Sequence, residues 1–339
     1  MDSLQDQTND KLTDNLKFSK NDSLLKGFQE AVLSVINLEL SVSFFQRICG
    51  WEIIARNEKN KTLNALWGLN GEVEIEEVVL RNPKEITGFL RIVKFKNVAQ
   101  KAIRASTRIW DSGGIFDLNM RAKDIDQLCK AFEDEGWNGF GEPHRFTFGK
   151  FDVSEVLMKG PHGITFALMQ RFAPPLVGYD HLAITSRVFN STTICKNLDV
   201  SVDFFINKLG FKTYFQTAGN ERSHGENVIG IPPNINGDID VPIYIMHPNG
   251  ENTGSIELLE TKQLKGRNVS RLAKPPNLGI LMLRFPVADC HSYAKELQAK
   301  GVQLNSEVHA IEIHPYGKMN IFSVITPDGV WLEFIEKLS

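Results

Sequence analysis

The chain has 339 residues, of which 42% are hydrophobic and 23% are charged, and its formal net charge is −3. A chain of this length can form two domains with separate cores, and these fractions are ordinary for a soluble globular protein. The slightly negative charge and the lack of a basic stripe argue against nucleic acid as a partner, and no apolar run reaches the length of a membrane span.

The amino-terminal segment and the cysteines indicate where the protein resides. Residues 1–22 are rich in Asp, Asn, Lys, Ser and Gln and lack the apolar core of a signal peptide, so we expect a disordered tail. The four cysteines are scattered without paired spacing. Disulfides are therefore not expected, and we predict a cytoplasmic protein.

Hydrophobic spacing predicts a β-α-β-β-β unit directly after the tail. Apolar residues at helical spacing in 38–48, followed by Gly50, indicate a helix and its stop signal. Stretches of strand character predict the strands of this unit at 28–35, 51–55, 64–69, 73–81 and 89–95.

A second unit begins at Gly114 and ends at a proline-rich linker. It is predicted to have a helix at 125–135 and strands at 115–121, 144–149, 151–159 and 164–170. The run Ala173-Pro174-Pro175-Leu176 marks a linker over 173–178. The first two units thus form an expected amino-terminal domain at 23–172.

Two further units make up an expected carboxyl-terminal domain at 179–339. The third unit is predicted to open with a strand at 179–185, followed by an insertion at 187–196 and a helix at 198–208. Its remaining strands are predicted at 241–247 and 255–260. The fourth unit is predicted to have strands at 279–284, 319–326 and 330–335 and a helix at 289–299.

The two halves repeat each other at an offset of roughly 160–166 residues, as expected of a duplicated chain. Residues 43–51 resemble residues 203–211, and each stretch ends in a glycine and an aromatic residue. Residues 161–168 resemble residues 327–334, but the first stretch has Ala167 where the second has Glu333. Only the second of these two stretches therefore has a polar residue at this position.

Tandem units of this kind resemble the vicinal oxygen chelate superfamily, which includes glyoxalases, extradiol dioxygenases and bleomycin-resistance proteins. The resemblance implies an α+β fold with four β-α-β-β-β units in two paired domains, each a cup-shaped mixed sheet with outer helices. The motifs that carry it are His181-Leu182-Ala183-Ile184, the helix at 198–205 with Leu209-Gly210-Phe211, and Pro327-Asp328-Gly329 before Trp331-Leu332-Glu333-Phe334.

In that superfamily, the first and last strands of paired units hold one divalent metal. Carried over by position, the resemblance implies the metal ligands His181, Glu257 and Glu333, while the fourth position falls near Ile280, which cannot bind metal. One imidazole and two carboxylates suit Fe, Mn, Co, Ni or Zn and leave coordination sites free for substrate. The corresponding positions of the first half imply a domain without metal, since they fall near Glu30, Arg91, Ile115 and Ala167.

Other polar residues are candidates for substrate contacts. His314 and Tyr316 lie in a predicted loop bordering the cup, and we expect them to act as catalytic acid/base groups or to bind substrate. Arg284 follows an apolar strand and is a candidate partner for Glu333 or for an acidic substrate. The stretch 225–236 is either a lid over the cup or a long connection.

The resemblance leaves two classes of function open. The first is a metal-dependent enzyme acting on a small molecule with adjacent oxygens, either a ring-cleaving dioxygenase or a glyoxalase- or isomerase-like lyase. Extradiol enzymes use two histidines and one glutamate, a pattern from which Ile280 departs. The second class is a metal-free protein that binds a small molecule, as resistance proteins of this fold do. The expected partner is a small-molecule substrate, and the protein is expected to be a monomer or a homodimer.

Overall fold

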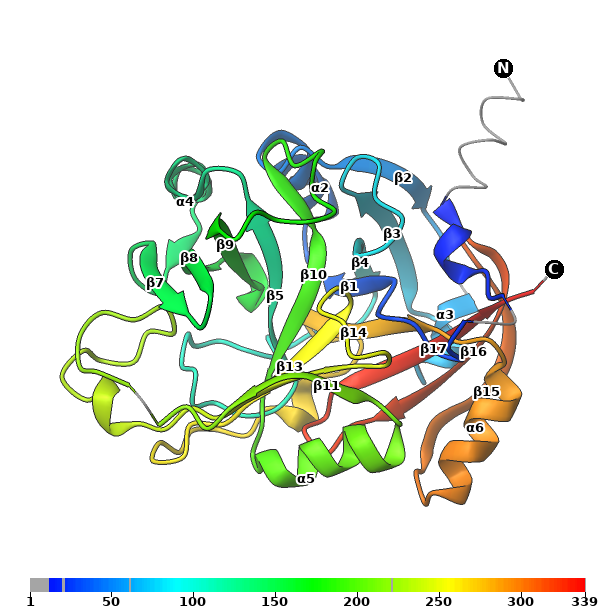
Figure 1. Ribbon diagram of the computed structural model, residues 1–339. Coiled ribbons are helices and arrows are strands. Elements are labelled where there is room, and N and C mark those ends of the chain that lie inside the picture. The colour runs from blue at the N-terminus through cyan, green and yellow to red at the C-terminus, as the bar shows by residue number, and fades with distance from the viewer. Residues whose placement is uncertain (1–11, 20–21, 61, 221, 339) are drawn as a thin grey trace.

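The computed structural model describes residues 12–19, 22–60, 62–220 and 222–338. They form two mixed β-sheets with few helices, and each sheet is built from two β-α-β-β-β units (Figure 1). The predicted α+β fold with four units is therefore confirmed. In this part of the chain, no helix is both long enough and apolar enough to cross a membrane.

The first sheet joins the first and fourth units, which lie at opposite ends of the chain. Its strands are β1 (Glu30–Ser34), β2 (Glu52–Asn57), β3 (Glu74–Arg81), β4 (Phe89–Lys96), β14 (Gly279–Pro286), β15 (Leu304–Ile313), β16 (Gly317–Ile325) and β17 (Trp331–Lys337). Their order is β15-β16-β17-β14-β1-β4-β3-β2. β1 and β14 pair antiparallel at the seam between the units, where Glu30 faces Arg284.

The second sheet joins the second and third units, which are neighbours in the chain. Its strands are β5 (Ile115–Ala122), β6 (Asn138–Gly139), β7 (His144–Phe148), β8 (Phe151–Lys159), β9 (Thr165–Ala173), β10 (Thr185–Ile194), β11 (Lys212–Thr217), β12 (Ile243–His247) and β13 (Ser255–Leu259). Their order is β11-β12-β13-β10-β5-β9-β8-β6, and β7 also pairs with β8. At the seam, Asp117 of β5 faces Thr192 of β10.

This arrangement differs from the expected pairing of units that are adjacent in sequence. Each expected half, 23–172 and 179–339, contributes one unit to each sheet. The linker at 173–178 joins the two units of the second sheet and does not separate two independent sheets. The internal repeat identifies which segments are alike, but likeness does not determine which unit pairs with which.

One helix of each unit packs on the outside of its sheet, and all four begin with the same capping device. The helices are α2 (Leu38–Arg47), α4 (Ile125–Asp134), α5 (Leu198–Asp203), which continues as a π-helical turn over Phe204–Lys208, and α6 (Cys290–Ala299). The residue before each helix accepts a hydrogen bond from the backbone N–H three residues later, and these caps are Asn37, Asp124, Asn197 and Asp289.

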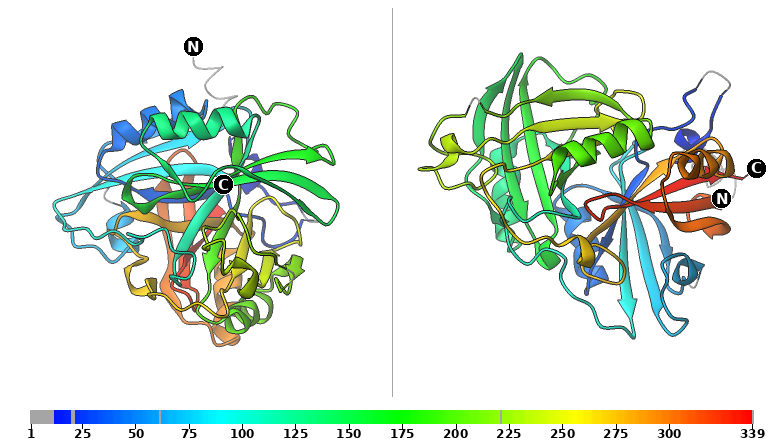
Figure 2. Two further views of the ribbon diagram at one scale, coloured as in Figure 1. Left: turned by 90° about the vertical axis from the view of Figure 1, so that its left-hand side faces the viewer. Right: turned by 90° about the horizontal axis from the view of Figure 1, so that it is seen from below.

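The outer faces of both sheets and the helices share one hydrophobic core. Leu33 of β1, Leu283 of β14 and Leu118 of β5 all belong to this cluster. The two sheets lie side by side in Figure 1 and in the right-hand view of Figure 2, the second in green and yellow and the first in blue, orange and red. Because side chains alternate along a strand, each sheet keeps an inner face directed away from the shared core.

Two predicted strands differ from the structure. The stretch 64–69 is not a strand, because residues Thr62–Leu66 form the short helix α3, which places buried Leu63 on the inner face of the first sheet. The first strand of the third unit is β10, not residues 179–185, and the stretch interpreted as an insertion forms most of this strand. Residues 190–193 of this strand are all polar although they are buried, so the usual apolar signal of a buried strand is missing.

The amino-terminal tail is in part ordered against the first sheet. Residues Asp14–Leu16 form a 3₁₀ turn, and Leu12 and Leu16 are buried in the apolar cluster of that sheet's inner face. The other residues of the expected disordered tail, 1–11, 20 and 21, lie outside the described residues.

Candidate functional site

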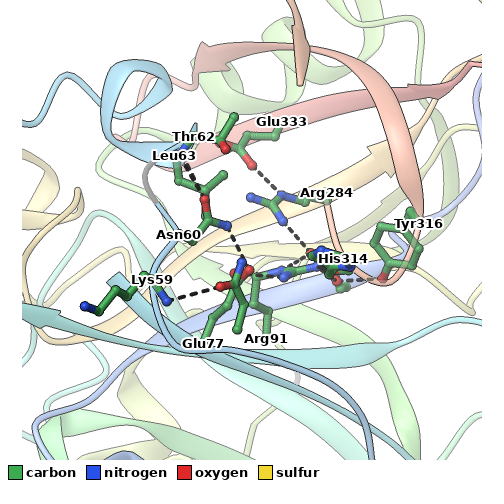
Figure 3. A network of polar contacts seen from close by, with 12 residues as sticks. Lys59, Asn60, Thr62, Leu63, Glu77, Arg91, Arg284, His314, Tyr316 and Glu333 are labelled. Carbon is green, nitrogen blue, oxygen red and sulfur yellow. Dashed lines mark hydrogen bonds and ion pairs between the residues drawn. The ribbon is translucent and has the colours of Figure 1, made fainter. Parts of the chain in front are cut away.

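We call the inner face of the first sheet the first inner face. It carries a fully buried network of charged side chains. Glu30, Arg91, Arg284 and Glu333 come from β1, β4, β14 and β17, and each side chain is 0% exposed. Arg91, Arg284 and Glu333 are labelled in Figure 3. Arg284 Nη1 lies 2.6 Å from Glu30 Oε1, and its Nε lies 2.5 Å from Glu333 Oε2. Arg284 thus pairs with Glu333, one of the two partners considered from the sequence.

Arg91 extends this network to a third carboxylate. Its guanidinium donates to Glu30 at 2.7 and 3.2 Å, to Glu77 at 2.8 Å and to the backbone carbonyl of His314 at 2.6 Å. Burial opposes ionisation of Glu30, but the adjacent Arg91 and Arg284 outweigh it, so the pKa of Glu30 is lowered. The three carboxylates are therefore held by two guanidiniums.

Neutral donors complete the network. Trp67 Nε1 donates to Glu333 Oε1 at 2.7 Å, Asn60 donates to Glu77 at 2.8 Å, and the Tyr316 hydroxyl donates to Glu30 at 2.6 Å. Each carboxylate oxygen of Glu30, Glu77 and Glu333 accepts at least one hydrogen bond. Guanidinium groups have no lone pair for a metal, so this donor set does not fit a divalent ion.

The residues expected to be catalytic belong to this network and not to an open site. Tyr316 is 2% exposed, and burial followed by the charge of Glu30 raises its pKa well above the usual value. His314 has an exposed side chain, and it is its backbone carbonyl that joins the network. The hydroxyl of Tyr316 therefore stays protonated near neutral pH, which does not suit a general base.

The structure does not bring the three expected metal ligands together. His181 lies in the turn before β10, where its Nε2 is 2.8 Å from Glu85, a carboxylate also held by Arg187. Glu333 belongs to the first sheet and Glu257 to the second. Within the described residues, no group of three His, Cys, Asp or Glu side chains could hold a metal ion. The cause is the pairing of the units, which separates 255–259 from 331–337.

The inner face of the second sheet is polar and partly open, and we call it the second inner face. Its central residues are Asp117 and Asn119 of β5, Glu155 of β8, Thr192 of β10 and Glu257 of β13. Thr192 stands between Asp117 and Glu257 in the strand register. Asn119 Nδ2 lies 3.0 Å from Asp117 Oδ1 and 3.3 Å from Thr192 Oγ1. Glu155 and Glu257 are half-buried.

The three acids of this face hold their protons more tightly than usual. Burial raises the pKa of Glu257 to about 8, and the charges of Asp117 and Glu155 add to this effect. Burial and Asp117 raise the pKa of Glu155 to about 8, and burial raises the pKa of Asp117 to about 7. Carboxyl groups with such pKa values are concentrated at functional sites.

A long connection covers one end of the second inner face. Ile231, Ile239 and Val241 lie between β11 and β12 and belong to the same buried cluster as Leu157 and Ala167 of the sheet. The stretch 225–236, for which the sequence left a lid or a plain connection open, therefore contributes to the apolar cover of this face. An apolar end beside a polar centre is the usual composition of a small-molecule site.

Sequence reasoning identified Glu257 on this face but missed its neighbours. A signal was present in β5, where Asp117, Asn119 and Arg121 alternate with the apolar Leu118 and Met120. Polar residues at every second position of an otherwise apolar strand all lie on the same face of the sheet. The carried-over position near Ile115 fell outside this alternating stretch.

Replacing Arg284 by Met should lower the free energy of unfolding by about 3–5 kcal/mol, because Glu30 and Glu333 would keep buried charges without their partner. Chemical denaturation measures this loss. The matched control is Arg47→Met, which removes an ion pair to Glu135 at 3.0 Å from an arginine that is 55% exposed. The control should cost less than about 1 kcal/mol, and equal losses in both variants would contradict a central role for the network.

Thermal stability should fall as the pH rises from about 5 to 8. The raised pKa values of Asp117, Glu155 and Glu257 mean that the folded state binds more protons than the unfolded state in this window. Melting curves across this range measure the effect. Glu257→Gln should flatten the profile, whereas Glu307→Gln, at an exposed position of β15, should leave it unchanged.

Comparison with known proteins agrees with this fold. Residues 179–334 match the model of the Glyoxalase/Bleomycin resistance protein/Dioxygenase superfamily. No curated protein sequence matches the chain significantly.

Solved structures resemble the chain over nearly its whole length. A point mutant of glyoxalase I from Zea mays superposes with a TM-score of 0.64 at 15% identity, covering 97% of each chain. A structure of glyoxalase I from Zea mays without a mutation has a TM-score of 0.62 at 14% identity, covering 92% of each chain. A Bacillus subtilis protein for which a dioxygenase function has been suggested has a TM-score of 0.59 at 10% identity, covering 94% of this chain and 87% of its own.

At these identities the solved structures establish the fold, and the family model adds the sequence relationship. Residues 179–334 are thus similar in sequence to the Glyoxalase/Bleomycin resistance protein/Dioxygenase superfamily, and the chain as a whole has a two-domain tandem fold like that of glyoxalase I from Zea mays.

Proposed function

We propose that this protein binds a small molecule on the second inner face and that it does so without a metal held by its own side chains. The observation that supports the proposal is the state of Glu155 and Glu257. Both are half-buried, and neither carboxyl group accepts a side-chain hydrogen bond from the residues that the structure describes. They are thus available to a ligand, whereas the carboxylates of the first inner face are all occupied.

The arrangement around these two acids favours a bound organic molecule. The amide of Asn119 and the hydroxyl of Thr192 offer further polar contacts beside them. Ile231, Leu157 and Ala167 supply an apolar wall at one end. A few fixed polar groups next to an apolar wall orient a ligand and exclude water from it.

A second candidate function is an isomerase- or lyase-like enzyme that transfers protons. The observation that favours it is the pair of pKa values of about 8 for Glu155 and Glu257. Groups with such pKa values exist in both protonation states near neutral pH, so one can donate a proton while the other accepts one. The ring-cleaving and metal-dependent alternatives require the set His181, Glu257 and Glu333, which the fold does not assemble.

Binding can be tested by ligand-observed NMR with a mixture of anionic, neutral and cationic aromatic fragments. We expect hits whose affinity falls about fivefold or more in Glu257→Gln, as for the loss of one hydrogen bond to a buried group. Glu307→Gln on the first sheet serves as the control and should bind normally. A screen in which every hit binds Glu257→Gln and Glu155→Gln as tightly as the natural protein would contradict the site.

Metal content distinguishes this proposal from the metalloenzyme alternative. Protein purified without added metal and dialysed against a chelator should contain well below one equivalent of Fe, Mn, Co, Ni or Zn by elemental analysis, because the donor sets of both inner faces, within the described residues, lack a group of three ligands. One retained equivalent that disappears in both His181→Ala and Glu257→Ala would restore the metal site expected from the sequence.

A further inference from the structure

A buried arginine without a counter-charge lies on the second inner face. Arg121 of β5 is 2% exposed, yet no Asp or Glu in the described ranges forms an ion pair with it. Its Nη1 lies 2.6 Å from Met169 Sδ, and its Nε has no hydrogen-bond partner in this part of the chain. Buried charges are normally paired, because an isolated one loses its hydration without compensation.

Aromatic groups hold the guanidinium of Arg121 in place. Its central carbon lies 3.9 Å from the centroid of the Phe189 ring, which is a cation–π contact. The side chain of Tyr179 also interacts with it. These neighbours position the guanidinium, and neither of them is an acidic residue.

A second arginine lies nearby and has the same deficit. Arg171 of β9 is half-buried, its guanidinium lies 4.3 Å from the centroid of the Phe151 ring, and its Nε also lacks a partner among the described residues. The charge of Arg171 acts on Arg121 and lowers its pKa, after the larger effect of burial. Two cations with few anions close by create a site of positive potential.

The nearest acid in the strand register does not neutralise this pair. Glu155, Met169 and Arg121 form one row across β8, β9 and β5. Glu155 interacts with Arg121, but no ion pair joins them, and burial together with Asp117 raises the pKa of Glu155 to about 8, so that it is largely protonated at pH 7. A protonated carboxyl group can instead donate a hydrogen bond to an anion bound between the two residues.

We infer that Arg121, with Arg171 beside it, is a subsite for a carboxylate group of the ligand. The inference rests on the proposed binding function and adds the chemical class of the ligand. A planar guanidinium offers two parallel N–H donors that match the two oxygens of a carboxylate, and the aromatic rings of Phe189 and Phe151 present flat surfaces beside it. The ligand is thus a small organic acid that lies with its carboxylate at the arginines and its polar substituents toward Glu257.

The test compares benzoate with benzamide, two probes of the same shape that differ in charge. Titration at pH 7 by isothermal calorimetry, or by ligand-observed NMR for weak binding, should show benzoate binding about tenfold more tightly than benzamide, as expected for a charge-assisted bidentate contact. In Arg121→Gln the two affinities should agree within about twofold. In Arg145→Gln, an exposed arginine of β7 that pairs with Asp152, the preference should persist.

Two further measurements keep the test decisive if Arg121→Gln does not fold. Arg171→Gln alters a half-buried side chain and should reduce the preference for benzoate by about threefold or more, as for a second charge at the site. The second measurement follows the arginine Nε–H resonances of the natural protein by NMR. The resonance of Arg171, identified by its absence from the Arg171→Gln spectrum, should shift on addition of benzoate. One further arginine resonance should shift with it.

The outcomes separate the carboxylate subsite from the binding function. Equal affinities for the two probes in the natural protein, both weakened by Glu257→Gln, would overturn the subsite and leave the binding site intact. No binding of benzoate at about 10 mM would also overturn the subsite, since such a contact supports millimolar affinity. Failure of all fragments to respond to Glu155→Gln and Glu257→Gln would overturn the binding function itself.

Discussion

The pairing of Arg284 with Glu30 and Glu333 is the constraint on which the first sheet depends. Glu30 comes from the first unit and Glu333 from the fourth, so one guanidinium joins strands from the two ends of the chain. Arg91 anchors Glu30 to Glu77 in the same way. Buried ion pairs add little net stability, but they penalise every arrangement that would leave one partner alone. The network therefore specifies the register at the seam between β1 and β14.

The inner faces of the two sheets differ in how their charged and acidic residues are arranged. On the first inner face, oppositely charged residues pair with one another, and Trp67, Asn60 and Tyr316 donate further hydrogen bonds to their carboxylates. On the second inner face, three acids lie near one another, and burial raises the pKa of each. On the first inner face every carboxylate oxygen of the network accepts a hydrogen bond, although Nη2 of Arg284 lacks a partner among the described residues. On the second inner face Glu155 and Glu257 accept no side-chain hydrogen bond from this part of the chain.

Much of the fold could be predicted from the sequence, because its signals are local. The helices at 38–47, 125–134 and 290–299 follow from apolar spacing and Asx caps, and the inner position of Glu333 follows from strand alternation. The pairing of units could not be predicted, because it depends on contacts between residues about 250 positions apart, such as Glu30 with Arg284. That single uncertainty also explains the misplaced site, since the ligand set was assembled from units that belong to different sheets.

The order of the units has a consequence for how the chain is made on the ribosome. The second sheet is complete once residues 255–259 have been synthesised, because both of its units are adjacent in the chain. The first sheet is complete only after residues 331–337 have been made, and β1 presents an unpaired edge until β14, residues 279–286, is available to pair with it. Exposed edges of this kind invite pairing with other chains. The second sheet can thus form early, while the first sheet stays incomplete until residues 331–337 have been made.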